Sequence, residues 1–151
     1  MKAFNNILFP IDFSECSKKV FPYAHDLAKN LDAKLYLLFV AHDISYLTTI
    51  EVSRDTLMNT VAEIARAGEE QMQAFCDKEL SGFPDYESNV VTGNPAEKIV
   101  EFVSEKGIDM IVMGTHGRTG LDRTLMGSVA DHVIKNAPVP VVTINPYRLK
   151  A

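Results

Sequence analysis

The chain has 151 residues, of which 46% are hydrophobic and 23% are charged, and its formal net charge is -5 at pH 7. This length suits a single domain, residues 1–151, with a substantial buried core. The acidic balance argues against non-specific binding to nucleic acid or to an anionic membrane, because both favour basic surfaces. The acidic net charge does not exclude a phosphate ligand, since backbone amides and helix N-termini bind anions without charged side chains.

The N-terminal apolar run is too short for a signal peptide and is interrupted by Pro10 and Asp12. No stretch approaches the roughly 20 apolar residues that span a bilayer. Cys16 and Cys76 are far apart in the chain and form no metal-ligand spacing. Cysteines of this kind are expected to stay reduced, which predicts a cytoplasmic protein.

The first elements are a buried apolar strand at Asn6–Ile11 and the helix that follows it. Either Ser14 or Ser17 is placed to cap this helix. Pro22 is expected to kink its first turns or to delay its start. A second buried strand is predicted at Lys34–Ala41.

The segment Asp43–Arg54 is unusually apolar for a loop, so we expect a lid over a ligand, a docking surface for a partner, or plain packing on the domain. Apolar residues then recur every three or four positions, which predicts a long helix at Asp55–Leu80. A third strand at Tyr86–Thr92 is more polar and is expected nearer a sheet edge.

A strong helix start follows, because Asn94 suits the N-cap and Pro95 suits the first helical position. Gly107 is expected to end this helix. A fourth strand is predicted at Asp109–Met113.

A glycine-rich loop at Gly114–Leu125 leads to a helix at Gly127–Asn136 and a last strand at Val139–Ile144, in which Pro140 favours an edge position. Strands that alternate with helices, and that read as continuous apolar runs, predict an α/β fold. The parallel sheet of that fold is covered by helices on both faces.

Glycines in the loop after the fourth strand follow a pattern: Gly114, two residues, Gly117, nine residues, then Gly127-Ser128. The first two glycines allow a sharp turn and let backbone amides approach an anion. Gly127 allows a phosphate close to the helix start, where the amides of Gly127, Ser128 and Val129 are expected to be free.

Two side chains add to this phosphate hypothesis. Arg118 supplies a planar cationic donor. The Ser128 hydroxyl is placed either to donate to a phosphate oxygen or to cap its own helix. The pattern is neither a P-loop nor the GxGxxG dinucleotide fingerprint. The alternative is a flexible surface loop, but position after a parallel strand favours a ligand site.

The stretches FPIDFSECS, NPAEKIVEFVSEKGIDMIVMG and MGTHGRTGLDRTLMGSVADHVIKNAPVPVVTI resemble the universal stress protein family over nearly the whole chain. The motif Gly-x2-Gly-x9-Gly-Ser/Thr marks the ATP-binding subgroup of that family and is intact here. The resemblance implies a doubly wound five-stranded sheet of order 3-2-1-4-5 and a homodimer through the last strand. It also implies ATP as ligand, or AMP or ADP, with Mg²⁺ or Mn²⁺ bound through the phosphates.

The resemblance further implies that Asp12 faces the glycine loop and meets the adenosine part of the ligand, while Pro10 lines the base pocket. Val40 would hold the adenine edge through backbone groups, and Met113 would pack nearby. The alternative for Asp12 is a turn or helix cap. The alternative for Val40 and Met113 is core packing.

His116 lies inside the glycine loop, and we favour a contribution of its backbone amide to phosphate binding over an acid–base role. The sequence contains no recognisable catalytic triad and no recognisable cluster of metal ligands. The sequence therefore predicts a nucleotide-binding stress-response module rather than an enzyme. Two alternatives stay open: a slow ATPase or self-phosphorylating enzyme using Arg118 and a metal ion, and a nucleotide-free interaction protein with a purely structural loop.

Overall fold

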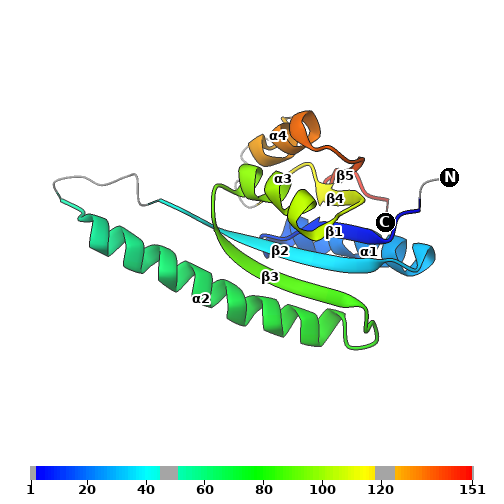
Figure 1. The fold of residues 1–151 in the computed structure, drawn as a ribbon, viewed down its shortest axis with the longest axis horizontal. Coiled ribbons are helices and arrows are strands. Elements are labelled where there is room, and N and C mark those ends of the chain that lie inside the picture. Colours follow the sequence, from blue (N-terminus) through cyan, green and yellow to red (C-terminus); the bar gives the residue numbers. More distant parts are fainter. Residues whose placement is uncertain (1–2, 45–50, 118–124, 151) are drawn as a thin grey trace.

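The computed structural model describes residues 3–44, 51–117 and 125–150. In this part of the chain, five parallel strands form one sheet in the order β3-β2-β1-β4-β5 (Figure 1). The strands are β1 (Asn6–Pro10), β2 (Lys34–His42), β3 (Tyr86–Gly93), β4 (Met110–Gly114) and β5 (Val141–Ile144). The expected α/β class and strand order are therefore confirmed.

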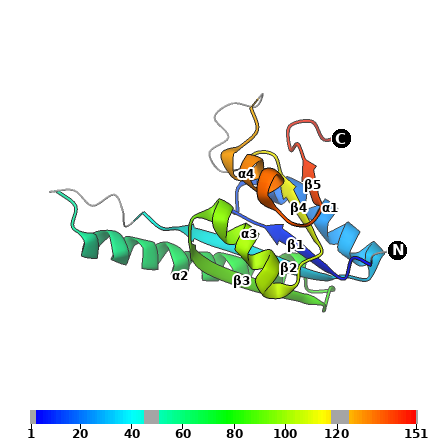
Figure 2. The ribbon, with the colours of Figure 1, turned by 45° about the horizontal axis from the view of Figure 1, so that its top comes forward.

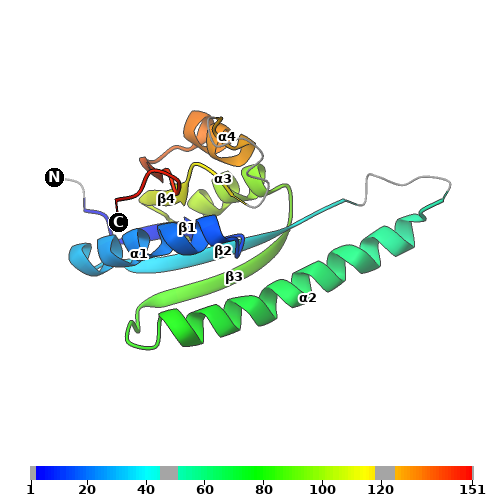
Figure 3. The same ribbon diagram turned by 180° about the vertical axis from the view of Figure 1, so that it is seen from behind.

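Helices cover both faces of the sheet (Figures 1 and 3). They are α1 (Glu15–Leu31), α2 (Arg54–Glu79), α3 (Pro95–Lys106) and α4 (Ser128–Asn136). One core cluster joins the sheet to α1 and α2 through residues such as Phe21 and Met72. The second joins it to α3 and α4 through residues such as Phe102 and Val133. In folds of this kind, ligands bind at the edge of the sheet where the parallel strands end.

Side chains cap three helix starts and explain where these helices begin. Ser14, Ser53 and Asn94 accept hydrogen bonds from the third following amide in α1, α2 and α3, respectively. The expectation that Pro22 delays α1 is wrong, because the Ser14 cap and the buried Cys16 hold its first turn in place. The helix is assigned as continuous through Pro22.

The two edges of the sheet differ. β3 lies at one edge, as expected from its polar sequence, and its Glu87 holds two lysines, Lys34 at 3.3 Å and Lys106 at 2.7 Å. β5 lies at the other edge and starts at Val141 rather than at the predicted residue 139. The backbone before β5 still pairs with β4, since the Ile111 amide donates to the Pro140 carbonyl.

The two cysteines are buried free thiols. Burial raises the pKa of the Cys76 thiol, which lies on α2 and packs into the core. Within the described ranges, no helix is both long enough and apolar enough to cross a membrane.

Candidate functional site

The candidate site lies where β1 and β4 end, in the middle of the sheet. These strands are direct neighbours, and the chain leaves β1 for α1 on one face and β4 for α4 on the other (Figure 2). In parallel sheets, connections that diverge in this way mark the position at the carboxyl edge where ligands commonly bind, and we call this position between β1 and β4 the crevice. Two of the predicted site residues, Asp12 and Gly117, follow these strands and lie close together.

Asp12 and Gly117 lie next to each other at this edge of the sheet. A Cβ on Gly117 would lie only 2.5 Å from Oδ2 of Asp12, so the carboxylate occupies the space beside this glycine. Asp12 also forms the turn into α1, because its Oδ1 accepts a hydrogen bond from the Ser14 amide at 3.0 Å. The structure thus brings Asp12 against the glycine loop, and the turn-forming alternative holds at the same time.

Helix α4 begins without a side-chain cap. Its N-cap is Gly127, a residue that has no side chain to form a capping hydrogen bond, and none is found at this helix start in the described part of the chain. The amides of Ser128 and Val129 stand at the first two helical positions, where an α-helix offers no carbonyl partner. The helix dipole adds partial positive charge at this end, so the start of α4 has the chemistry of an anion site.

Two expectations about this helix start are wrong. The Gly127 amide is not free, because it donates to the Thr115 carbonyl at 2.8 Å. Ser128 does not cap its own helix, because it lies one residue past the N-cap position. The Thr115 bond ties the two ends of the glycine loop together, so Gly127 holds the loop closed instead of offering its amide to an anion.

Gly114 and Gly127 have tight surroundings that leave little room for a side chain. A Cβ on Gly114 would lie 3.1 Å from the His116 carbonyl oxygen and 3.3 Å from Cγ2 of Val20. A Cβ on Gly127 would lie 3.2 Å from the Thr115 carbonyl oxygen. The glycines therefore allow the loop to fold onto itself and onto α1.

His116 is buried, with 7% of its surface exposed. Its Nδ1 pairs with the Thr115 hydroxyl at 2.7 Å, and its ring packs edge-on against Tyr147 at 5.1 Å. Its Nε2 has no hydrogen-bond partner among the described residues. Tyr147, in turn, accepts a hydrogen bond from the Cys16 thiol at 3.4 Å. Sequence reasoning missed Tyr147, and no spacing signal links the segment after β5 to the loop after β4.

The residues expected around the base lie on β1, β2 and β4. Pro10 is the last residue of β1 and pairs in register with Leu38. β2 continues four residues beyond that pair, so Val40 flanks the segment that follows β1. Met113 is buried, and Val40 packs against the same core cluster, so the core-packing alternative is true of both. Arg118 and residues 45–50 of the expected lid lie outside the described residues.

Two hollows lie away from the crevice. One, of about 770 Å³, lies between α1 and the segment after β5 and is lined by residues such as Tyr23 and Leu149. The other, of about 450 Å³, lies between α1 and α2 over Phe13 and Phe75. Among the described residues, no group of three or more histidines, cysteines and carboxylates is arranged to hold a metal ion.

Comparisons with known proteins agree with this architecture. The universal stress protein family matches residues 3–145. A universal stress protein of Methanocaldococcus jannaschii is 34% identical over 142 residues, covering 93% of this chain and 82% of the relative. The solved structure of the universal stress protein UspA from Lactobacillus plantarum has a TM-score of 0.83 at 25% identity and covers 95% of this chain and 99% of that one.

Two solved structures of more distant members share the fold and contain nucleotides. One is a universal stress protein in complex with cAMP, at 21% identity and a TM-score of 0.62, covering 96% of this chain and 99% of that one. The other is a protein from Archaeoglobus fulgidus in complex with dAMP, at 20% identity and a TM-score of 0.64, covering 95% and 99%. The family match over nearly the whole length and the shared architecture lead to one conclusion: this chain belongs to the universal stress protein family.

Proposed function

We propose that this chain binds ATP in the crevice between β1 and β4 and acts as a nucleotide-sensing module of the stress response. The observation that carries the proposal is the pairing of an uncapped helix start with a carboxylate at one edge of the sheet. Asp12 and Gly117 are in contact there, and α4 begins with amides that have no helical partner.

The proposed arrangement assigns one part of the ligand to each side of the crevice. The triphosphate lies on the amides of Ser128 and Val129, with help from the dipole of α4. The Asp12 carboxylate accepts hydrogen bonds from the ribose, since a carboxylate is an acceptor for hydroxyl groups. The base lies toward Pro10, Val40 and Met113.

The glycine loop completes the proposed phosphate site. Gly114 and Gly117 shape its backbone, His116 contributes its amide, and Arg118 adds a charged donor. Mg²⁺ or Mn²⁺ would be held mainly by phosphate oxygens and water, as Mg²⁺ commonly is in nucleotide sites. Residues 43–54 stay a candidate lid.

The relatives in complex with cAMP and with dAMP support an adenine nucleotide as the ligand class. AMP and ADP are therefore tested beside ATP. The surroundings of His116 favour binding over catalysis, because its Nδ1 is paired with Thr115 and its ring is packed against Tyr147. No contact in the described part of the chain favours the alternative of a slow ATPase.

The proposal includes a cytoplasmic homodimer. β5 is an edge strand, and an edge strand presents unpaired backbone groups that a second strand can use. Val142 on this strand and Ile134 on the neighbouring α4 are exposed apolar residues. The last strand of one chain would pair antiparallel with that of a second copy.

Isothermal titration with ATP, ADP and AMP tests the ligand, with thermal unfolding as a second readout. ATP should release or absorb heat at one site per chain and raise the melting temperature. Gly127→Leu should abolish the binding, because its side chain would meet the Thr115 carbonyl and the His116 backbone and would occupy the space at the start of α4 where the phosphate is proposed to lie. Absence of both heat and thermal shift in the unmodified protein would overturn the proposal.

A further inference from the structure

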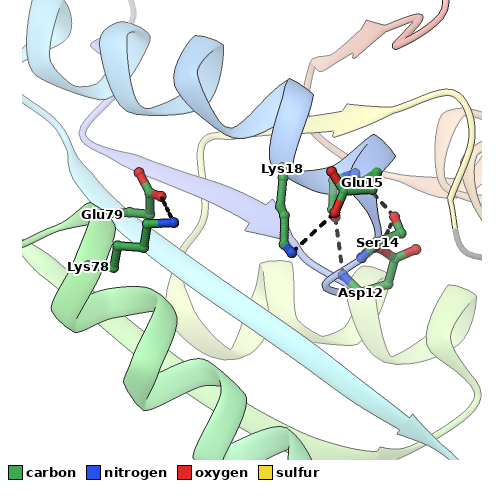
Figure 4. A network of polar contacts seen from close by, with 7 residues as sticks. Asp12, Ser14, Glu15, Lys18, Lys78 and Glu79 are labelled. Carbon is green, nitrogen blue, oxygen red and sulfur yellow. Dashed lines mark hydrogen bonds and ion pairs between the residues drawn. The ribbon is translucent and has the colours of Figure 1, made fainter.

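The turn between β1 and α1 is closed by a cycle of hydrogen bonds that joins Asp12, Ser14 and Ser17. The Ser14 hydroxyl donates to Oδ1 of Asp12 at 2.5 Å and accepts from the Ser17 amide at 3.2 Å. The Asp12 amide donates to the Ser17 hydroxyl at 3.2 Å. Figure 4 shows Asp12 and Ser14 joined at the start of α1. The Ser14 hydroxyl thus has both its donor and an acceptor position in use.

Phe13, between these two residues, has an unusual backbone conformation. Its φ of 61° is in the left-handed region, which costs a residue with a bulky side chain on the order of 1 kcal/mol or more. Packing of its ring holds the conformation in place, with ring centres 5.2 Å from Phe39 and 6.3 Å from Phe75. This conformation belongs to the turn in which the Ser14 amide and hydroxyl both reach the Asp12 carboxylate.

The consequence is a carboxylate whose orientation is set before any ligand arrives. Ser14 holds Oδ1 through two donors, its amide and its hydroxyl. Oδ2 lies directly beside Gly117. A carboxylate that accepts from two neighbouring ribose hydroxyls needs a defined orientation, because hydrogen bonds weaken steeply when they bend.

From this geometry we infer that Ser14 is a positioning residue that gives the site its preference for ribonucleotides. The inference rests on the proposed function and adds that the site distinguishes ribonucleotides from nucleotides that lack a ribose hydroxyl. By holding Oδ1, the Ser14 hydroxyl aligns the Asp12 carboxylate with the 2′- and 3′-hydroxyls of the ligand. Nucleotides that lack one of these hydroxyls leave the aligned carboxylate with an unmet acceptor and bind less tightly.

Ser14 also caps α1, so its two roles have to be separated. The chain offers a matched control, because Ser53 caps α2 with the same geometry and accepts from the Thr56 amide at 3.2 Å. Ser53→Ala should lose capping stability alone. Ser14→Gly removes the hydroxyl with little loss of capping, since glycine is nearly as good an N-cap as serine. Ser14→Thr keeps a hydroxyl and should restore function.

The experiment is a calorimetric titration of each variant with ATP, 2′-deoxy-ATP and 3′-deoxy-ATP, beside its melting temperature. We expect Ser14→Gly to bind ATP about tenfold more weakly than the unmodified protein, while its affinity for the deoxy analogues changes little. Its preference for ATP should therefore nearly vanish. Ser53→Ala and Ser14→Thr should keep the preference.

Three results would overturn the inference. Ser14→Gly could keep the preference for ATP, or it could weaken all three nucleotides by the same factor, as a general loss of the helix start would. The unmodified protein could also bind ATP and both deoxy analogues equally. In all three cases ATP binding itself persists, whereas an unmodified protein that binds no nucleotide overturns the proposed function as well.

Discussion

The Asp12 carboxylate fills the space beside Gly117 that a side chain at this position would need. These residues are far apart in the sequence and meet where β1 and β4 end. Glycine at position 117 is therefore required by a neighbouring carboxylate, in addition to any requirement of a bound phosphate. The contact makes the two sides of the crevice interdependent and leads to the first prediction.

Gly117→Ala should weaken ATP binding about tenfold, since the new methyl group displaces Oδ2 and breaks its alignment by Ser14. The fold should persist, because the displaced atom ends a side chain. Titration calorimetry measures the loss. Gly82→Ala is the control, because a Cβ there would meet nothing within 4 Å. Equal ATP affinity in both variants would contradict the prediction.

Tyr147→Ala should expose Cys16 to thiol reagents and destabilise the fold by about 1–3 kcal/mol, because the Tyr147 ring covers His116 and its hydroxyl accepts from Cys16. The rate of modification by a thiol reagent, followed by mass spectrometry, should rise at Cys16 and stay low at Cys76. Tyr147→Phe keeps the ring and should change the rate much less. Equal rates in both variants would show that the ring does not protect the thiol.

Glu87→Gln should lower the free energy of unfolding at neutral pH and flatten its dependence on pH in the acid range. The hydrogen bond from Lys106, followed by that from Lys34, lowers the pKa of Glu87 below its ordinary value of 4.5. A carboxyl with a lowered pKa stabilises the fold above that ordinary value, and the stabilisation is lost as the pH falls through the folded-state pKa.

Urea unfolding at pH 7 and at about pH 3 checks this, because the difference between the variant and the unmodified protein should shrink at the lower pH. Glu101→Gln serves as the control. Glu101 forms an exposed helical pair with Lys98, which is expected to contribute less than about 1 kcal/mol. A difference that is the same at both pH values would refute the role given to Glu87.

Gly68→Ala should destabilise the protein by about 1–3 kcal/mol, although alanine favours helices more than glycine does. A Cβ on Gly68 would collide with the Phe39 ring, so α2 could no longer pack as closely on β2. Urea unfolding measures the change. Ala67→Gly, one residue earlier and exposed, should cost only the difference in helix propensity, about 1 kcal/mol. A Gly68→Ala variant that is more stable than the unmodified protein would contradict the prediction.

Val142→Lys should convert the proposed dimer into a monomer and leave the fold intact, because Val142 is exposed on the edge strand β5. Sedimentation velocity gives the mass, and urea unfolding checks the fold. Val52→Lys, an exposed valine away from β5, should leave the mass unchanged. A monomeric unmodified protein, or a dimer that survives the β5 change, would contradict pairing through this strand.

The sequence predicted local features of the fold better than its long-range contacts. Helix starts at Ser14 and Asn94 follow from capping chemistry within a few residues, and the structure confirms both. The strand order was available only through the resemblance to a family, because alternation of strands and helices is compatible with several orders. The early start expected for the last strand failed because apolar residues also continue into the segment before β5.

The site was predictable as a loop and a helix start but not as a set of contacts. Nothing in the spacing of the residues indicates that Thr115 binds the Gly127 amide or that Tyr147 covers His116. The positive φ of Phe13 could not be predicted from the sequence either, since phenylalanine rarely adopts the left-handed conformation. Its conformation depends on rings from β2 and α2 that only the fold brings together.

The unlike edges of the sheet have a consequence for how many copies can assemble. At β3, Glu87 is held by Lys34 and Lys106, and such charged edge strands discourage further pairing. Only β5 is then suited to accept another chain. When identical edges pair about a twofold axis, no further edge of that kind remains exposed, so the proposed dimer would close at two copies and would not grow into a filament.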